Sequence, residues 1–230
     1  MVHFTDRRNA GQRLAMALGH LRGRELVVVG LAPGGVLVAE EVAHALGAPL
    51  DVLVVRDVEA PVDPGLLIAA AAPDASFVDN DQVRRLAVSQ QFVSRALVRA
   101  TWEVRTRDAL YRGERPPVAL TDRIVVLVDD GLATGMSLRA AIASIRRHQP
   151  RELIVAAPVR GPGQEEIGGR VDAFVCLSHA SATEQVGEWY DDFAPIHDEQ
   201  VIAALFERGA STWSRDGATD LSVSPGPRAG

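Results

Sequence analysis

The sequence predicts one α/β domain, built on a mostly parallel sheet with helices on both of its faces. Short continuous runs of aliphatic and β-branched residues recur along the chain, and segments with helical spacing of apolar residues separate them. The length of 230 residues, with 47% hydrophobic and 23% charged residues, suits one sizeable core. We expect this domain to cover residues 1–210. A tail rich in Ser, Thr, Gly and Pro follows over residues 211–230, and we expect it to be disordered.

The chain opens with a helix, a strand and a glycine-rich turn. Asp6 suits the N-cap of a helix that runs to about Leu21, because apolar residues recur there at helical spacing. The apolar run at residues 25–30 is the first predicted strand. A Pro-Gly-Gly turn at residues 33–35 follows it, and a second helix runs from this turn to Gly47.

Four later apolar runs supply the remaining predicted strands, at residues 50–56, 123–129, 153–159 and 173–177. The run at 123–129 opens into a helix over about residues 138–148. Residues 59–121 form a long insert, with a small apolar segment at 66–72 and a helical stretch at about 82–111. Inserts of this length usually carry a lid or a binding loop. Because parallel strands place their loops at one carboxyl edge, we expect the ligand there.

The composition excludes several classes of protein. All 24 of the Lys and Arg residues are arginine, which excludes chemistry that needs a lysine nucleophile or a lysine phosphate clamp. The net charge of −6 and the scattered arginines argue against a nucleic-acid partner. The single cysteine, Cys176, allows neither a disulfide nor a cysteine metal site. No apolar run approaches the roughly 20 residues of a membrane span, so we expect no membrane partner and a cytoplasmic location.

Residues 124–137 combine the features of an anion site. A buried strand leads through a short loop with Gly131 and Gly135 into the start of a helix. Such a loop offers free backbone N–H groups and a favourable helix dipole to a phosphate. The hydroxyl groups of Thr134 and Ser137 add donors from the same turn.

An acidic pair, Asp129 and Asp130, ends the strand that precedes this loop. These carboxylates would repel a phosphate, so they must face another part of the ligand. Ribose hydroxyls and a hydrated Mg²⁺ are partners that paired carboxylates hold. The segment therefore predicts a site for a sugar phosphate, with the phosphate at one end of the loop and the diol at the other.

Residues 125–137 resemble the phosphoribosyl pyrophosphate motif of type I phosphoribosyltransferases: four apolar residues, two acidic residues, then Thr-Gly and a hydroxyl residue. The resemblance implies that fold, with a small hood, and Mg²⁺-dependent transfer of the 5-phosphoribosyl group from phosphoribosyl pyrophosphate to a nucleobase or other small aromatic acceptor, with release of pyrophosphate. It makes Asp129 and Asp130 the catalytic pair, which would hold the Mg²⁺ through water. The substrate-binding residues that the motif implies are Gly131, Ala133, Thr134, Gly135, Met136 and Ser137.

The similarity extends over most of residues 4–205, to a bacterial group of phosphoribosyltransferases. Its matching segments are Asp6-Arg7, Ala10-Gly11, Gly34-Gly35-Val36, Val54-Val55-Arg56, Tyr111-Arg112-Gly113, Ala157-Pro158-Val159 and Trp189-Tyr190-Asp191-Asp192-Phe193. In such proteins the loop after the first strand binds pyrophosphate, which implies that role for Gly34 and Gly35. Residues after the last core strand form a hood over the base, so either buried aromatics or residues that stack on the acceptor are expected at Trp189, Tyr190 and Phe193. The oligomeric state stays open, with a homodimer as one option.

Two positions depart from the pattern of that group. Pro33 stands where the first loop usually carries an arginine, and Asp57 stands where a lysine usually follows Arg56. One preorganised donor can stabilise a transition state by ~3 kcal/mol, so the absence of these two positive side chains would weaken the stabilisation of the leaving pyrophosphate. Arg56, which we place in the substrate site, or Arg84 or Arg85 of the insert would have to compensate. Without compensation, the alternative is a non-catalytic regulatory module that binds a ribose phosphate or a nucleotide.

Position 133 is alanine, so the loop has no carboxylate there to act as a base on a 6-oxopurine. This resembles the adenine-type loop, but pyrimidine and non-nucleobase acceptors fit the same absence. Other catalytic classes lack their motifs: the chain has no Gly-Lys-Ser/Thr, no Gly-x-Gly-x-x-Gly and no Asp-x-Asp-x-Thr at the acidic pair. The 6 histidines show no metal-ligand spacing.

Overall fold

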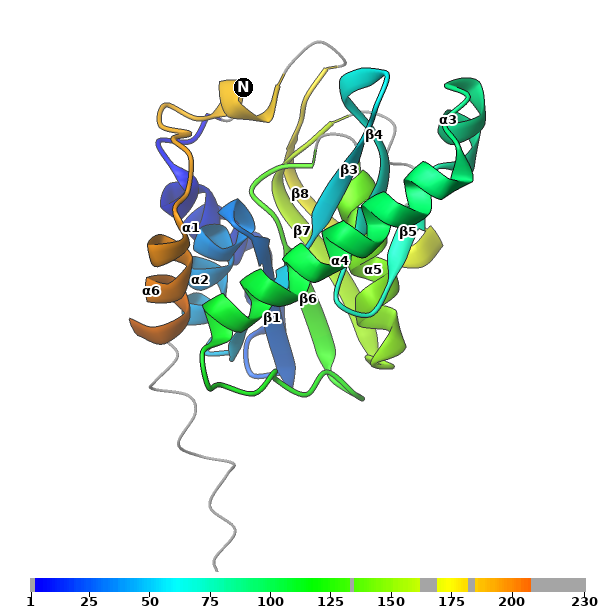
Figure 1. Cartoon of the computed structure of the whole chain (residues 1–230). Coiled ribbons are helices and arrows are strands. Elements are labelled where there is room, and N and C mark those ends of the chain that lie inside the picture. Colours follow the sequence, from blue (N-terminus) through cyan, green and yellow to red (C-terminus); the bar gives the residue numbers. More distant parts are fainter. Residues whose placement is uncertain (1–2, 133–134, 162–168, 182–184, 208–230) are drawn as a thin grey trace, which may run out of the picture.

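Figure 1 shows a computed structural model of the chain, which describes residues 3–132, 135–161, 169–181 and 185–207. Its main sheet has five strands in the order β2-β1-β6-β7-β8, and every neighbouring pair is parallel. The predicted sheet is therefore confirmed, with small differences at the strand ends. The strands are β1 (Leu26–Ala32), β2 (Leu50–Val54), β6 (Ile124–Val128), β7 (Glu152–Arg160) and β8 (Ala173–His179).

Helices cover both faces of this sheet, as predicted. Along the central strands the side chains alternate, so that Val28 and Val126 lie in one core while Val27 and Val125 lie in another. This burial on both faces explains why the strands are continuous apolar runs. The second core is closed by α5 (Met136–Arg147), and the first by α1 (Arg7–Ala17), α2 (Gly34–Leu46), α4 (Gln90–Arg112) and α6 (Asp198–Glu207).

Local signals set the ends of the first two helices. The Asp6 carboxylate accepts a hydrogen bond from the Asn9 N–H at 2.7 Å, which confirms the predicted N-cap of α1. This helix is shorter than predicted, because it ends at Ala17 and a separate 3-10 turn, η1 (Gly19–Leu21), follows. Helix α2 ends at Gly47 with φ of 66°, the left-handed conformation that glycine adopts without strain.

The insert forms a second sheet, which is antiparallel and has the order β3-β4-β5. Its strands are β3 (Arg56–Ala60), β4 (Asp63–Ala71) and β5 (Ser76–Val78). The single strand predicted at residues 50–56 is thus wrong at its end, since the chain leaves the main sheet after β2 and starts β3. Figure 1 shows the β3–β4 hairpin rising at the top of the molecule, at the same end as the segment that follows β8.

The helical stretch predicted at about residues 82–111 is two helices, α3 (Asn80–Arg85) and α4. The break has a local cause. Ala87 has a positive φ of 52°, and the Ser89 hydroxyl caps α4 by accepting a hydrogen bond from the Phe92 N–H. Within the described ranges, no helix has the length and apolar character needed to cross a bilayer. The predicted tail at residues 211–230 lies outside the described residues.

Candidate functional site

A cavity of about 710 Å³ opens where β1 and β6 end. These neighbouring parallel strands each lead into a helix, α2 or α5, so the N-termini of both helices lie at the same sheet edge. Helix N-termini carry free N–H groups and a partial positive charge, and the volume suits a small ligand. The charged residues of the lining are Arg7, Arg56, Asp57, Glu59, Glu103, Asp129 and Asp130.

The first loop, between β1 and α2, packs tightly against the second loop, between β6 and α5. A Cβ added to Gly35 would lie 2.6 Å from the Val128 carbonyl oxygen and 2.8 Å from the Asp129 Cα. A Cβ added to Gly34 would overlap the Asp130 carboxylate. Both positions therefore require glycine for close approach. The loop enters α2 through a cis peptide bond between Ala32 and Pro33.

The acidic pair lies between the two helix N-termini. Asp129 accepts a hydrogen bond from the Asp130 N–H at 2.9 Å. Burial raises the pKa of Asp129 well above its ordinary value, and the charges of Asp130 and Asp57 raise it further. This crowding of carboxylates favours a cation or hydroxyl groups as their partner.

Asp130 is held by Arg7, which the sequence analysis placed in a matching segment but gave no role in the site. Arg7 Nε donates to Asp130 Oδ2 at 2.7 Å, and Arg7 Nη1 donates to the Ala194 carbonyl oxygen at 2.9 Å. The guanidinium also lies 3.9 Å from the centre of the Phe193 ring, and Arg7 is only 8% exposed. One local signal points to this residue: a cation in the first turn of a helix is unfavourable next to the dipole, so it needs a partner elsewhere.

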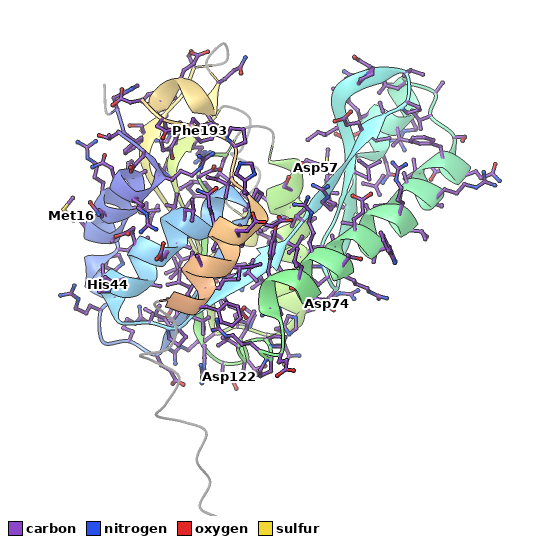
Figure 2. All side chains as sticks on the ribbon, turned by 60° about the vertical axis from the view of Figure 1, so that its left-hand side comes forward. Met16, His44, Asp57, Asp74, Asp122 and Phe193 are labelled. Atoms are coloured by element: carbon purple, nitrogen blue, oxygen red, sulfur yellow. The ribbon has the colours of Figure 1, made fainter. Side chains whose placement is uncertain are left out.

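A side-chain hydrogen bond joins the start of α5, which ends the second loop, to the insert sheet. The Ser137 hydroxyl lies 2.7 and 2.8 Å from the two carboxylate oxygens of Asp57, to which it donates. Burial raises the pKa of Asp57, and the Ser137 hydrogen bond partly offsets that effect. The hydroxyl predicted to bind phosphate thus has an internal anion as its partner. Figure 2 shows Asp57 where β3 approaches the start of α5.

The other predicted residues of the second loop are placed by packing. Gly135 has φ of 72° and caps α5, and an added Cβ at Gly131 would overlap Val186. Met136 is buried against Ala70 of the insert sheet, so its side chain packs in a core. Ala133 and Thr134, both predicted to bind substrate, lie outside the described residues.

The predicted aromatic residues fall into two situations. Tyr190 is buried at 6% exposure, and its hydroxyl donates to the Asp130 carbonyl oxygen at 2.6 Å. Burial raises its pKa, so the hydroxyl remains a donor. Trp189, at the end of η3 (Val186–Trp189), is also buried. Tyr190 therefore supports the second loop through the Asp130 backbone. Phe193 lines the cavity, and the Arg7 guanidinium lies over its ring.

Arg56, which was predicted as a substrate residue, lines the cavity, and its Nε pairs with Glu103 Oε2 at 3.1 Å. The other two arginines considered for compensation, Arg84 and Arg85, lie in α3 and interact with Asp81 and Gln82 of the same helix. Neither lines the cavity.

The acidic pair was also predicted to hold Mg²⁺. Across the part of the chain that the structure describes, no group of three or more His, Cys, Asp and Glu side chains is arranged as a metal site. Two carboxylates fit Mg²⁺ when the substrate supplies oxygens, because this ion keeps several waters and is often bound through one or two carboxylates together with phosphates. Asp129 and Asp130 have the donor chemistry for that mode.

The family model described as "Phosphoribosyl transferase domain" matches residues 7–187. Two curated relatives from Mycobacterium tuberculosis, strains CDC 1551 / Oshkosh and ATCC 25618 / H37Rv, are each named "Putative phosphoribosyl transferase" and are 38% identical over 98% of this chain. The chain spans about half (51%) of the length of these relatives.

Among solved structures, the crystal structure of TT1426 from Thermus thermophilus is 41% identical. The match covers 89% of this chain and 98% of that protein, with a TM-score of 0.74. The resemblance predicted from the residues is confirmed at the level of the family: the chain belongs to the phosphoribosyl transferase domain family.

Proposed function

We propose that the protein transfers the 5-phosphoribosyl group from phosphoribosyl pyrophosphate to a nitrogen atom of a nucleobase or other small aromatic acceptor, with Mg²⁺ as cofactor. The observation that carries this proposal is the shared cavity, in which two helix N-termini flank one acidic pair. A substrate with two separated phosphate groups and a diol between them matches that order of sites.

Each end of the substrate has its own group of protein atoms. The 5′-phosphate would lie at the N-terminus of α5, next to the Ser137 hydroxyl, and the pyrophosphate at the N-terminus of α2, next to Gly34 and Gly35. Asp129 and Asp130 would bind the ribose hydroxyls and hold the hydrated Mg²⁺. The cation would offset the charge of the leaving pyrophosphate.

The reaction needs no covalent bond to the protein. A bond forms between the acceptor nitrogen and ribose C1, and the bond from C1 to pyrophosphate breaks, with pyrophosphate taking the electron pair. The acceptor nitrogen loses its proton to solvent. The chain would stabilise the developing charges by preorganised donors and exclude water from C1.

The charge of the lining supports a neutral acceptor. Asp57, Glu59 and Glu103 bring negative charge from the insert, while Arg56 is paired with Glu103. A carboxylate-bearing acceptor would meet repulsion there. Phe193 would contribute apolar surface near the acceptor, and Tyr190 would act indirectly by holding the Asp130 backbone.

A second candidate function is a regulatory module that binds a ribose phosphate or a nucleotide without turnover. Two observations favour it: the Asp57 carboxylate accepts a hydrogen bond from Ser137 of the second loop, and the first loop has Pro33 in place of a cation. A cytoplasmic location and a domain over residues 1–210 belong to the proposal under either function, and a homodimer is one option for the oligomeric state.

One assay separates the two functions. Pyrophosphate release from phosphoribosyl pyrophosphate is measured with Mg²⁺ over a panel of purines, pyrimidines and small neutral or acidic aromatic compounds, while calorimetry follows ribose 5-phosphate binding. Turnover with a neutral base supports the transferase. Binding without turnover supports the module, and a folded protein that neither binds nor turns over contradicts both.

A further inference from the structure

We propose that Arg7 binds the leaving pyrophosphate and so replaces the arginine that the first loop lacks at Pro33. This inference rests on the proposed function and extends it to a residue outside both loops. Arg7 comes from α1, which precedes the first strand, and reaches the cavity from the side of the hood segment, residues 185–196.

The position of the guanidinium is the first reason. A Cβ added to Gly34 would lie 3.1 Å from Arg7 Nε, so the guanidinium lies directly against the first turn of α2. Both residues line the same cavity. An anion bound to the free N–H groups at the start of α2 would therefore be within reach of the Arg7 side chain.

The second reason is the supply of donors. A guanidinium has five N–H groups in a fixed plane. Nε donates to Asp130 and Nη1 donates to the Ala194 carbonyl oxygen, and within the described residues these are the hydrogen bonds that Arg7 makes. The Nη2 group is left for a ligand. Two donors of one guanidinium suit the paired oxygens of a phosphate group.

The third reason is preorganisation. The Asp130 carboxylate compensates the cost of burying the Arg7 charge, and the Phe193 ring supports the face of the guanidinium at 3.9 Å. Figure 2 shows Phe193 on the hood side of the molecule, across from Asp57 on the insert side. A cation held in place before the ligand binds loses little side-chain entropy on binding.

The other cations near the cavity are less suitable. Of the arginines in its described lining, Arg56 pairs with Glu103 on the insert side, whereas Arg7 lies at the α2 N-terminus. Arg8, the next residue along α1, turns away and pairs with Glu40 and Glu41. Arg8 does not line the cavity, which makes it a matched control for Arg7.

The test measures two ligands separately by calorimetry with Mg²⁺ present: inorganic pyrophosphate and ribose 5-phosphate. Arg7→Gln should weaken pyrophosphate binding at least about tenfold, the effect of one lost charge-assisted hydrogen bond, and Arg7→Lys by less. Ribose 5-phosphate affinity should change by less than about threefold. Arg8→Gln should leave both affinities at the wild-type values.

Arg7→Gln leaves the Asp130 carboxylate without its cation. The two ligand affinities are therefore also compared between the single variant Asp130→Asn and the double variant Asp130→Asn/Arg7→Gln. Neither of these variants has an unpaired carboxylate at position 130. The selective loss of pyrophosphate binding should persist in that pair. Unchanged pyrophosphate affinity, or an equal loss for both ligands, overturns the role of Arg7 while the proposed function stands. A wild-type protein that binds neither ligand contradicts the proposed function, and the inference with it.

Discussion

The first and second loops occupy equivalent places in the fold, yet they carry different chemistry. Each follows a central parallel strand, β1 or β6, and each opens a helix at the same sheet edge. The second loop carries its own polar groups, namely Asp129, Asp130 and Ser137. The first loop offers glycine backbone and a proline, and the cation beside it comes from another helix.

This difference shows that a loop can keep the shape of an anion site without keeping its charge. Gly34 and Gly35 are required by close packing against the acidic pair, whatever the ligand. The charge beside the loop comes from Arg7, 123 positions away in the sequence from its partner Asp130.

The largest effect is expected at the second loop. Asp130→Asn should weaken ribose 5-phosphate binding at saturating Mg²⁺ by about tenfold to a hundredfold, because a charged acceptor for the ribose hydroxyls is lost. Calorimetry measures the affinity. Asp191→Asn is the control, since that exposed carboxylate pairs with His3 away from the cavity, and it should have no effect. An unchanged affinity for Asp130→Asn would argue against its role.

At the first loop, we expect a substitution to lower the stability of the fold. Gly35→Ala forces a Cβ against the backbone of Val128 and Asp129, and should lower the free energy of unfolding by about 1–3 kcal/mol. Thermal or denaturant unfolding measures the change. Gly19→Ala is the matched control, because its Cβ would meet no atom within 4 Å. Equal stability of the two variants would show that the loops do not pack as described.

A gain of affinity is expected at the contact between the second loop and the insert. Asp57→Asn removes the negative charge next to Ser137, so phosphate binding should become about three- to tenfold tighter. Glu59→Gln makes the same change of charge on the same strand without that contact, and its effect should be smaller. Titration with ribose 5-phosphate decides the matter, and a weaker binding by Asp57→Asn would make Asp57 a ligand residue instead.

The smallest effect concerns pH. The pKa of Asp129 is raised, so the folded protein binds more protons than the unfolded chain above the ordinary value of 3.8, and this residue reduces stability as the pH rises above that value. Asp129→Asn removes this loss of stability. The free energy of unfolding at pH 7 should rise by about 1 kcal/mol, which corresponds to an increase in Tm of about 2–4 °C.

For Asp172, the effect of ionisation on the stability of the fold has the opposite sign. A hydrogen bond from the Leu153 N–H lowers the pKa of Asp172, so this carboxylate stabilises the fold above pH 3.8 and the stabilisation is lost as the pH falls. Asp172→Asn should therefore lower Tm at pH 7 while Asp129→Asn raises it. Thermal unfolding between about pH 3 and pH 8 measures both, and Tm shifts of the same sign at pH 7 would contradict the assignment.

Local sequence patterns predicted the parts of the site that depend on neighbours in the chain. One continuous run of the sequence contains the strand at residues 123–129, the acidic pair and the helix start. The N-cap Asp6 and the C-cap Gly47 each stand directly beside the helix that they end. The family followed from the same run. These features follow from period, caps and turns, which are properties of adjacent residues.

The remaining parts depend on contacts between distant residues. Nothing near Arg7 in the sequence indicates Asp130, and nothing near Asp57 indicates Ser137. Strand β3 was missed because its residues, Arg-Asp-Val-Glu-Ala, are largely charged and pair as a strand only through β4. Tertiary packing also decided that Tyr190 supports the second loop through its backbone.

The most direct test of the two-loop site is whether ribose 5-phosphate and inorganic pyrophosphate bind at the same time. Calorimetry with Mg²⁺ titrates each ligand into protein saturated with the other, and both are then tested as competitors of phosphoribosyl pyrophosphate. We expect the two small ligands to bind together, one at each helix N-terminus, and each to displace phosphoribosyl pyrophosphate. Mutual exclusion of the two ligands, or no binding of either to the folded protein, would contradict a site made of two separate loops.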